Sequence, residues 1–307
     1  MIIRKRPGLL ALFFIWRGSV IQRIYRQVLV VMALSGLVVL AHRADPGLVP
    51  TFNSAPFALL GIALSVFLGF SNNACYDRWW EARKQWGAMI AVSRDLSRQT
   101  LILETRGPEA VAARRSLLRL AIAFAYALVG YLREGAGAEG IARHLPDELK
   151  AGLAASRFRP EFVIRQMGAV LARLRAENRI SDIEFKLLDA SLLRMVDAFT
   201  ACERILTTPV PFGYTLLLHR TAYIFCFLLP FGFADILGWA TPLAAGLVAY
   251  TFFGLDAIGD ELEEPFGTLP NDLPIFAMTR TIEVTLLEGL GETDLPPALQ
   301  PVDYVLQ

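Results

Sequence analysis

The chain has 307 residues, of which 54% are hydrophobic and only 19% are charged, and its mean hydropathy is +0.44. Because an average soluble protein carries about 25% charged residues, this composition favours an integral membrane protein and excludes a disordered chain, a coiled coil or a collagen. The net charge of +1 excludes a general nucleic-acid binder. Three cysteines without a CxxC pair provide neither a disulfide framework nor a zinc site.

The N-terminal quarter of the chain contains two predicted membrane crossings. Residues 27–42 and 46–76 lack Asp, Glu, Lys and Arg, and a helix needs about 20 mostly apolar residues to cross the hydrocarbon core. With flanking apolar residues included, we predict membrane helices over about 25–43 and 56–76. No small-residue cleavage site follows the first apolar run, so we expect a retained anchor rather than a signal peptide.

The basic residues predict the orientation of these crossings. The first 26 residues contain Arg4, Lys5, Arg6, Arg17, Arg23 and Arg26 and no acidic residue. Positive charge is enriched on the cytoplasmic side of membrane helices, so we expect the N-terminus in the cytoplasm. Four crossings in total return the C-terminus to the same side.

Three apolar residues in the second predicted crossing recur at intervals of four, namely Ile62, Val66 and Phe70. On a helix with 3.6 residues per turn this interval drifts by only about 40° per step, so the three side chains share one face. Such a stripe is typical of a lipid-facing or buried surface, and it is also the pattern of residues that line a pore.

A charged and helical region follows the second crossing, over about 78–212. Its one long uncharged run, 120–132, has only 13 residues, so we expect a buried cytosolic helix rather than a fifth crossing. Ser181 and Glu184 have the spacing of a capping box and predict the start of another helix. We expect residues 78–212 and 258–307 to form one large cytosolic helical region.

Two further crossings are predicted near the C-terminal end, over about 215–235 and 239–257, where charges are again absent from 221–234 and 236–255. Four acidic residues follow them: Asp260, Glu261, Glu263 and Glu264. Carboxylates of this kind either bind a hard cation or form a solvated flank of the membrane helix. The sequence contains no HExxH, GxSxG, P-loop or Rossmann glycine motif, so we expect neither an enzyme nor a bound cofactor.

Four short motifs occur in the order found in the bestrophin family of ion channels. Residues 16–19 (WRGS) resemble the family's N-terminal signature, and residues 78–83 (RWWEAR) resemble its RWW signature. Residues 209–215 (PVPFGYT) are similar to the stretch before the third crossing, and residues 264–267 (EPFG) resemble the PFG signature. The motifs extend over nearly the whole chain, which therefore resembles a bacterial bestrophin.

The resemblance implies an all-α membrane protein that assembles as a homopentamer, with one pore on the five-fold axis. The three apolar rings that form the neck of the pore in this family correspond to Ile62, Val66 and Phe70, the stripe already noted. Its second constriction, at the cytosolic aperture, corresponds to Ile183. Animal members have an aromatic residue in the middle ring, so Val66 makes this neck less tightly closed.

Calcium gating is weakened in this sequence. Animal bestrophins follow the PFG motif with a run of acids that binds calcium, whereas residues 268–272 here read TLPND. Asp272 is the one carboxylate left as a residual calcium ligand, and a site for a hard cation needs several oxygen ligands. We therefore expect a channel that works without calcium or any other bound metal.

Selectivity is expected to come from charges near the pore, because apolar rings do not discriminate by charge. Asp182 and Glu184 beside Ile183 would favour cations, although both residues also suit a helix start. Bacterial relatives similar to this sequence are described as passing monovalent cations, sodium included, and animal members pass chloride. The sequence thus predicts a cation channel, with a chloride channel of the same fold as the alternative.

The expected setting is the bacterial inner membrane, with lipids, monovalent ions and further copies of the chain as partners. A non-conducting membrane scaffold is the alternative of a different class. The apolar stripe at 62–70 argues against it, because a scaffold has no need for a ring-forming surface.

Overall fold

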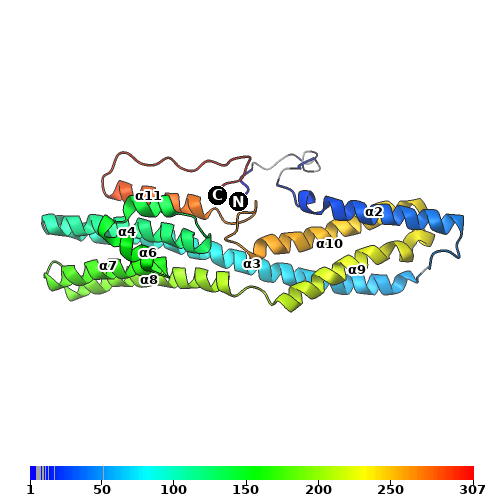
Figure 1. Ribbon diagram of the computed structural model, residues 1–307, viewed down its shortest axis with the longest axis horizontal. Coiled ribbons are helices and arrows are strands. Elements are labelled where there is room, and N and C mark those ends of the chain that lie inside the picture. Colours follow the sequence, from blue (N-terminus) through cyan, green and yellow to red (C-terminus); the bar gives the residue numbers. More distant parts are fainter. Residues whose placement is uncertain (5–7, 9, 11, 13, 17, 51) are drawn as a thin grey trace. The chain divides into compact units, whose positions relative to one another are not determined.

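The computed structural model describes residues 1–307 except 5–7, 9, 11, 13, 17 and 51. Lys5, Arg6 and Arg17, three of the basic residues on which the predicted orientation depends, lie outside the described residues. The described part is almost entirely helical (Figure 1). Its β-structure consists of isolated bridges that pair Val305 with Ile2 and with Val302.

The helices in chain order are α2 (Ile21–Ala44), α3 (Ser54–Gln99), the 3₁₀ helix η1 (Thr100–Thr105), α4 (Pro108–Leu132), α5 (Ala138–His144), α6 (Asp147–Ala155), α7 (Arg159–Ala176), α8 (Asp182–Thr207), α9 (Phe212–Leu237), the 3₁₀ helix η2 (Gly238–Ala240), α10 (Thr241–Glu263) and α11 (Ile275–Gly289). The chain forms two compact units. We call residues 4–79 and 209–265 the apolar unit, and residues 1–3, 80–208 and 266–307 the polar unit.

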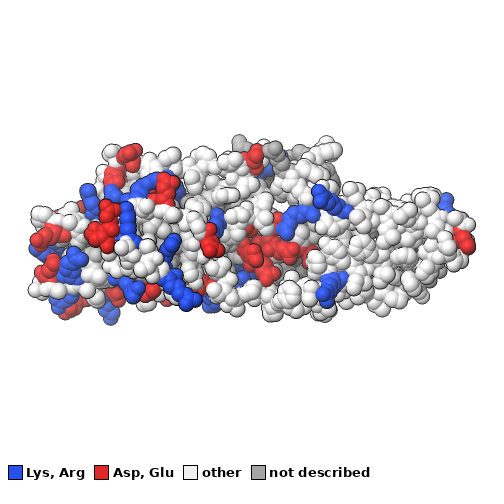
Figure 2. Space-filling view, viewed as in Figure 1, with Lys and Arg blue, Asp and Glu red and all other residues white. Residues whose placement is uncertain are grey.

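Four stretches of the described residues are long and apolar enough to cross a membrane: Ile21–Ala44, Ser54–Thr105, Pro108–Leu132 and Phe212–Glu263. The last contains α9 and α10, which η2 separates. The predicted crossings at 25–43, 56–76, 215–235 and 239–257 therefore all lie on helices, although α3 continues well past residue 76. The visible face of the apolar unit carries few charged side chains (Figure 2).

The apolar unit packs α2, α9, α10 and the first half of α3 around a hydrophobic core. Val31, Cys226, Ala249 and Phe253 lie fully inside this core. Small residues let the helices approach closely, as is common in membranes. At Gly246 a Cβ atom would lie 2.6 Å from the Met32 side chain, so α2 and α10 could not pack in this way around a larger residue.

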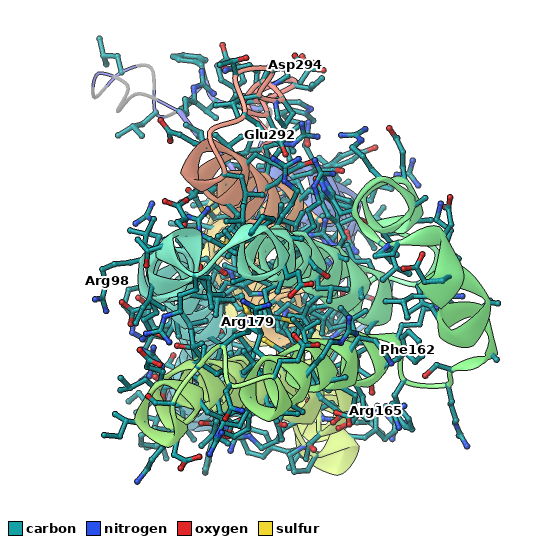
Figure 3. The ribbon with its side chains drawn as sticks, turned by 90° about the vertical axis from the view of Figure 1, so that its left-hand side faces the viewer. Arg98, Phe162, Arg165, Arg179, Glu292 and Asp294 are labelled. Carbon is teal, nitrogen blue, oxygen red and sulfur yellow. The ribbon has the colours of Figure 1, made fainter. Side chains whose placement is uncertain are left out.

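The polar unit is built around α4, which packs against α5, α7 and α11. In the apolar window of α4, 72% of the residues are buried inside the chain, compared with 28% for α2. A helix that faces lipid leaves its apolar side chains exposed, so burial in the polar unit explains the composition of α4 without a membrane crossing. Figure 3 shows the unit end-on, with Arg98 and Arg165 at the edge of the view and the partly exposed Arg179 in the middle of it.

Candidate pore-lining surface

The first half of α3 presents one buried face and one exposed apolar face. Leu64 and Leu68 are each 2% exposed and pack in the core of the apolar unit. Ile62, Val66 and Phe70 are 64%, 50% and 62% exposed. Since α3 is a continuous α-helix, these three residues share one face, as predicted from their spacing. The described residues leave at least half of each of these side chains exposed, so the face is available to lipid or to further copies.

Packing and hydrogen bonds fix the orientation of α3 in the apolar unit. Gly61 lets the Phe225 ring come close, because a Cβ atom there would lie 3.1 Å from Phe225 Cζ. At the other end of this half, Arg78 Nε donates a hydrogen bond to the Glu263 carbonyl at 3.1 Å. Arg78 begins the RWW motif, and Glu263 is the residue before the EPFG motif at 264–267, so this bond holds the start of one motif next to the start of the other.

Ile183 lies in the first turn of α8 in the polar unit and is 73% exposed. The predicted capping box fixes this turn. Ser181 Oγ accepts the Glu184 N–H at 3.3 Å, and Glu184 Oε2 accepts the Ser181 N–H at 2.7 Å. A firmly capped first turn therefore presents the Ile183 side chain to solvent.

The two acidic residues beside Ile183 each bind an arginine. Asp182 pairs with Arg175, and Glu184 pairs with Arg106 at 2.7 Å. The hydrogen bond from Arg175 lowers the pKa of Asp182, and the Ser181 backbone N–H, with Arg106, lowers the pKa of Glu184. Both carboxylates are thus ionised at neutral pH, but each has a positive charge next to it.

The loop that follows the PFG motif is closed by an arginine. Arg133, at the end of α4, donates from Nε to the Phe266 carbonyl and from Nη2 to the Leu273 carbonyl, each at 2.8 Å. Asp272 is 2% exposed, and its Oδ2 accepts the Leu269 N–H at 2.6 Å. Among the described residues, no group of three or more His, Cys, Asp or Glu side chains could hold a metal ion. The geometry of Asp272 is that of a loop-stabilising residue.

The acidic residues at the end of α10 do not form a common site. Glu261 is 5% exposed and pairs with Arg23 at 3.1 Å, and Arg23 also lies 3.8 Å from Asp260. Glu263 accepts the Val210 N–H at 3.1 Å. The alternative of a solvated flank is therefore wrong for Glu261, which is buried and pairs with the partly exposed Arg23 of α2.

An ionisable pair within the apolar unit was not predicted from the sequence. His219 of α9 lies 2.6 Å from Asp256 of α10, and the Tyr223 ring lies 4.5 Å from the His219 ring. Ionisable residues inside membrane segments are costly unless paired, so this contact stabilises the packing of α9 against α10. Asp256 interrupts an apolar run, which is a signal for such a pair, but the sequence does not identify its partner.

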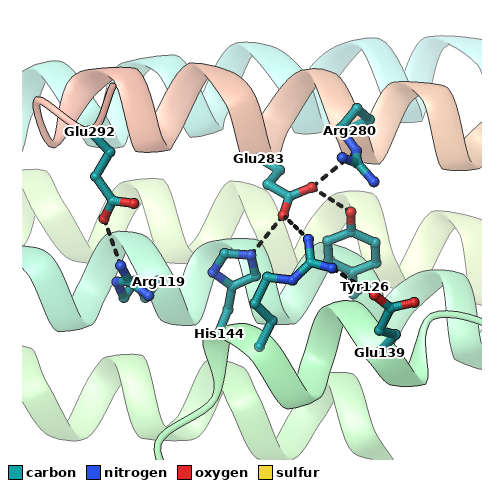
Figure 4. Close-up of polar contacts among 8 residues, drawn as sticks. Arg119, Tyr126, Glu139, His144, Arg280, Glu283 and Glu292 are labelled. Atoms are coloured by element: carbon teal, nitrogen blue, oxygen red, sulfur yellow. Dashed lines mark hydrogen bonds and ion pairs between the residues drawn. The ribbon is translucent and has the colours of Figure 1, made fainter. Parts of the chain in front are cut away.

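A buried carboxylate in the polar unit was also not predicted. The Glu283 side chain is fully buried and accepts a hydrogen bond from Tyr126 at 2.6 Å; Arg280 Nε lies 3.1 Å away in an ion pair, and His144 Nε2 lies 2.8 Å away (Figure 4). Arg143 completes the cluster at 3.5 Å. These contacts join α11 to α4 and α5. The signal in the sequence was a glutamate at a core position of an apolar helix.

Comparison with protein families gives a match to the bacterial and fungal bestrophin model over residues 1–288. Among curated proteins, the chain is 44% identical over 306 residues to the voltage-dependent anion channel-forming protein mll4386 of Mesorhizobium japonicum, covering 99% of this chain and 96% of that protein. It is 40% identical over 301 residues to the voltage-dependent anion channel-forming protein YneE of Escherichia coli K12, covering 98% of each chain.

Among solved structures, the chain is similar to a bacterial bestrophin homologue from Klebsiella pneumoniae. The TM-score is 0.83 at 38% sequence identity, and the match covers 88% of this chain and 99% of that one. A second structure of that homologue, which carries a point mutation, gives a TM-score of 0.83 at 37% identity and is covered completely. The similarity therefore extends over both units and is high in sequence as well as in fold.

Proposed function

This chain belongs to the bacterial and fungal bestrophin family and is therefore an ion channel, and we propose that five copies of it enclose one pore whose neck is formed by Ile62, Val66 and Phe70. The observation that supports this proposal is the exposed apolar face of α3, which lies opposite the residues that anchor the helix in the core. A ring of copies turns each of these residues into a ring of side chains.

An apolar ring acts as a barrier because it offers ions no ligand in place of their hydration shell. A narrow ring excludes water and blocks ions, and a wider ring lets hydrated ions pass. We place the second constriction at Ile183, whose side chain is held in an exposed position at the start of α8. The polar unit, which includes residues 80–208 and 266–307, is then the cytosolic part of a single channel subunit.

We propose that the channel passes monovalent anions, and we retain sodium conduction as the alternative. The sequence predicted cations because Asp182 and Glu184 lie beside Ile183. In the fold each carboxylate pairs with an arginine, which reduces the negative potential at this point. The names of the relatives, voltage-dependent anion channel-forming proteins, also favour anions.

Reversal potentials test this assignment directly. Purified protein in planar bilayers under asymmetric sodium chloride should give currents that reverse near the chloride equilibrium potential. Reversal near the sodium potential would contradict anion selectivity while preserving the channel. An absence of current in every salt would support the non-conducting scaffold.

We further propose that the protein lies in the inner membrane of a bacterium with both termini in the cytoplasm. The basic residues of the first 26 positions support this orientation. Single cysteines introduced in the 43–53 loop should react with a membrane-impermeant maleimide added to intact spheroplasts, and cysteines in the polar unit should not. The reverse labelling pattern would contradict the orientation.

A further inference from the structure

The loop between α7 and α8 is bound to the end of η1 by two arginines. Arg106 directly follows η1, and its Nη1 donates to the Arg179 carbonyl at 2.7 Å, while Arg179 Nη1 donates in return to the Arg106 carbonyl at 3.3 Å. Arg106 also forms two hydrogen bonds with Glu184, from Nη2 to Oε1 at 2.7 Å and from Nη1 to Oε2 at 3.2 Å. We propose that Arg106 determines the ion selectivity of the cytosolic aperture, because it holds a positive charge against Glu184 beside Ile183.

The contact between Arg106 and Glu184 has a fixed geometry. The two side chains are only 33% and 19% exposed, and a planar guanidinium that binds a carboxylate through two hydrogen bonds is a strong and directional partner. Glu184 Oε2 also accepts hydrogen bonds from the Ser181 N–H at 2.7 Å and from the Ser181 hydroxyl at 2.9 Å. Neither partner can turn away without losing its bonds to the loop, so the positive charge stays next to the carboxylate.

The other carboxylate beside Ile183 has a much looser partner. Asp182 is 83% exposed and pairs with Arg175, which is 38% exposed. Exposed ion pairs are weak, and salt screens them. Arg179 is not a substitute for Arg106, because it pairs with Glu109. Removal of Arg106 is therefore expected to change the charge beside Ile183 more than removal of Arg175.

The position of Glu184 connects this pair to the ion path, and this step rests on the proposed function, which places Ile183 at the cytosolic aperture. Glu184 directly follows Ile183 in the first turn of α8. In physiological salt a charge acts over about 8 Å, so an unpaired carboxylate here acts on ions at the aperture. Five subunits would contribute five such carboxylates, which would attract cations and repel chloride. With Arg106 in place, each of these charges has a fixed counter-charge.

Reversal potentials of charge variants test the proposal. Under asymmetric sodium chloride, Arg106→Gln should lower the chloride-to-sodium permeability ratio at least about threefold, because five unpaired carboxylates then act together within a screening length of the aperture. Arg106→Gln combined with Glu184→Gln should restore the wild-type ratio, because the exposed charge is removed. Arg106→Lys, which keeps the charge without the two-pronged contact, should stay within about twofold of wild type.

A matched control removes the same charge from another surface of the polar unit. Arg165 is 63% exposed on α7 and lies 3.8 Å from Glu161, so Arg165→Gln should leave the permeability ratio unchanged. If Arg106→Gln does not fold, Glu184→Gln alone still tests the proposal. It leaves Arg106 without its counter-charge and should raise the chloride-to-sodium permeability ratio.

Thiol labelling measures the charge beside the aperture without any measurement of current. Ile183→Cys is labelled in detergent with a cationic methanethiosulfonate (trimethylammonium-ethyl) and an anionic one (sulfonatoethyl). The native thiols Cys75, Cys202 and Cys226 are buried, so the introduced thiol reports the local potential. Added to Ile183→Cys, Arg106→Gln should raise the cationic-to-anionic rate ratio at least about threefold, and Glu184→Gln should reverse this rise.

Two results would overturn the proposal. The first is a permeability ratio and a labelling ratio that Arg106→Gln, or Glu184→Gln where Arg106→Gln does not fold, leaves at the wild-type value. The second is a shift that persists when Arg106→Gln and Glu184→Gln are combined, since the cause would then be altered structure rather than the charge of Glu184. Wild-type protein that conducts in no salt would contradict the proposed function instead, and the labelling ratio would still decide whether Arg106 sets the charge at Ile183.

Discussion

The first half of α3 and the helix α4 have similar composition but opposite burial. Both contain long runs without charge, yet 17% of the residues in the apolar window of Ser54–Thr105 are buried, compared with 72% in Pro108–Leu132. The apolar side chains of α4 are covered by α5, α7 and α11 within the same chain. The described residues cover those of the α3 stripe only in part, since Ile62, Val66 and Phe70 are each at least 50% exposed. Hydropathy thus indicates that a helix needs an apolar environment, and burial shows whether the chain itself supplies it.

Truncation of an apolar side chain should change the stability of the protein far more in α4 than in the first half of α3, and this is the largest expected effect. Phe124 of α4 is fully buried and packs against Phe199, so Phe124→Ala should cost about 3–5 kcal/mol of stability. Val66→Ala on the α3 stripe should change stability by less than about 0.5 kcal/mol. Thermal unfolding in detergent, followed by circular dichroism, measures both variants. Equal Tm values would contradict the comparison.

Loss of a buried charge should have the next largest effect. Burial tends to raise the pKa of Glu283, but hydrogen bonds from His144 and Tyr126 and the charge of Arg280 outweigh it, so the pKa lies below its ordinary value. A lowered carboxyl pKa stabilises the fold above the unfolded-state pKa, about 4.3, and this contribution is lost as the pH falls through the folded-state pKa. Glu283→Gln should therefore cost about 1–3 kcal/mol at pH 7.

Chemical denaturation between pH 3 and pH 7 checks this expectation. The unfolding midpoints of wild type and Glu283→Gln should differ at pH 7 and converge toward pH 3. Arg98→Gln, at an exposed position of the same unit, provides the control. A difference between Glu283→Gln and wild type that is constant with pH would show that the charge of Glu283 is not responsible.

Substitutions at the proposed neck should change the current through the channel rather than the stability of the protein. Replacing Ile62, Val66 and Phe70 together with Ala removes bulk from the proposed axis and keeps helix propensity, so currents at matched protein should rise several-fold. Phe67→Ala alters an exposed residue of the same helix on another face and should have little effect. Native mass spectrometry should give five copies for each variant. A pentameric triple variant with wild-type current would contradict the neck assignment.

Substitution at the proposed cytosolic aperture should change the conductance less than substitution at the neck changes the current. Ile183→Ala should raise the single-channel conductance, because Ile183 is proposed to form the narrowest cytosolic ring. Leu187→Ala, one turn later on α8 and 55% exposed, serves as the control. Equal conductance in wild type and Ile183→Ala would place the constriction at another residue.

Chelation of calcium is expected to have no effect. Asp272 bonds within its own loop and Arg133 closes that loop from α4, so bilayer currents should be the same in EGTA and in millimolar calcium. Asp272→Asn should also leave the response to calcium unchanged. Reversible loss of current in EGTA would show that a calcium site exists.

Local features of the fold could be predicted from the sequence because they depend on neighbouring residues. The capping box of Ser181 and Glu184 and the shared face of Ile62, Val66 and Phe70 follow from spacing, and the positions of the candidate membrane helices follow from the length of the runs without charge. The interpretation of residues 120–132 as a buried helix rested on the length of the uncharged run, and their burial within the polar unit agrees with it.

Contacts between distant helices could not be predicted in this way. The partners in the pairs His219–Asp256 and Glu261–Arg23 are 37 and 238 residues apart, and their approach depends on how helices dock. The arginine partner of Glu184 was missed for the same reason, since Arg106 is 78 residues away, whereas Arg175, the partner of Asp182, is only seven residues away at the end of the preceding helix. Without these two partners, the sequence overstated the acidic charge beside Ile183. Charge counts predict local potential only after the partners of each charge are known.

Arg133 gives the 266–273 loop a property that a metal-bound loop lacks. A bound ion leaves when its concentration falls, so a loop that depends on it reports that concentration. The guanidinium of Arg133 is part of the chain, is always charged and is present at one equivalent in every subunit. A loop held by two hydrogen bonds from this group therefore always has its binding partner present. The attachment of Phe266 and Leu273 to the end of α4 therefore does not depend on the concentration of a free ion.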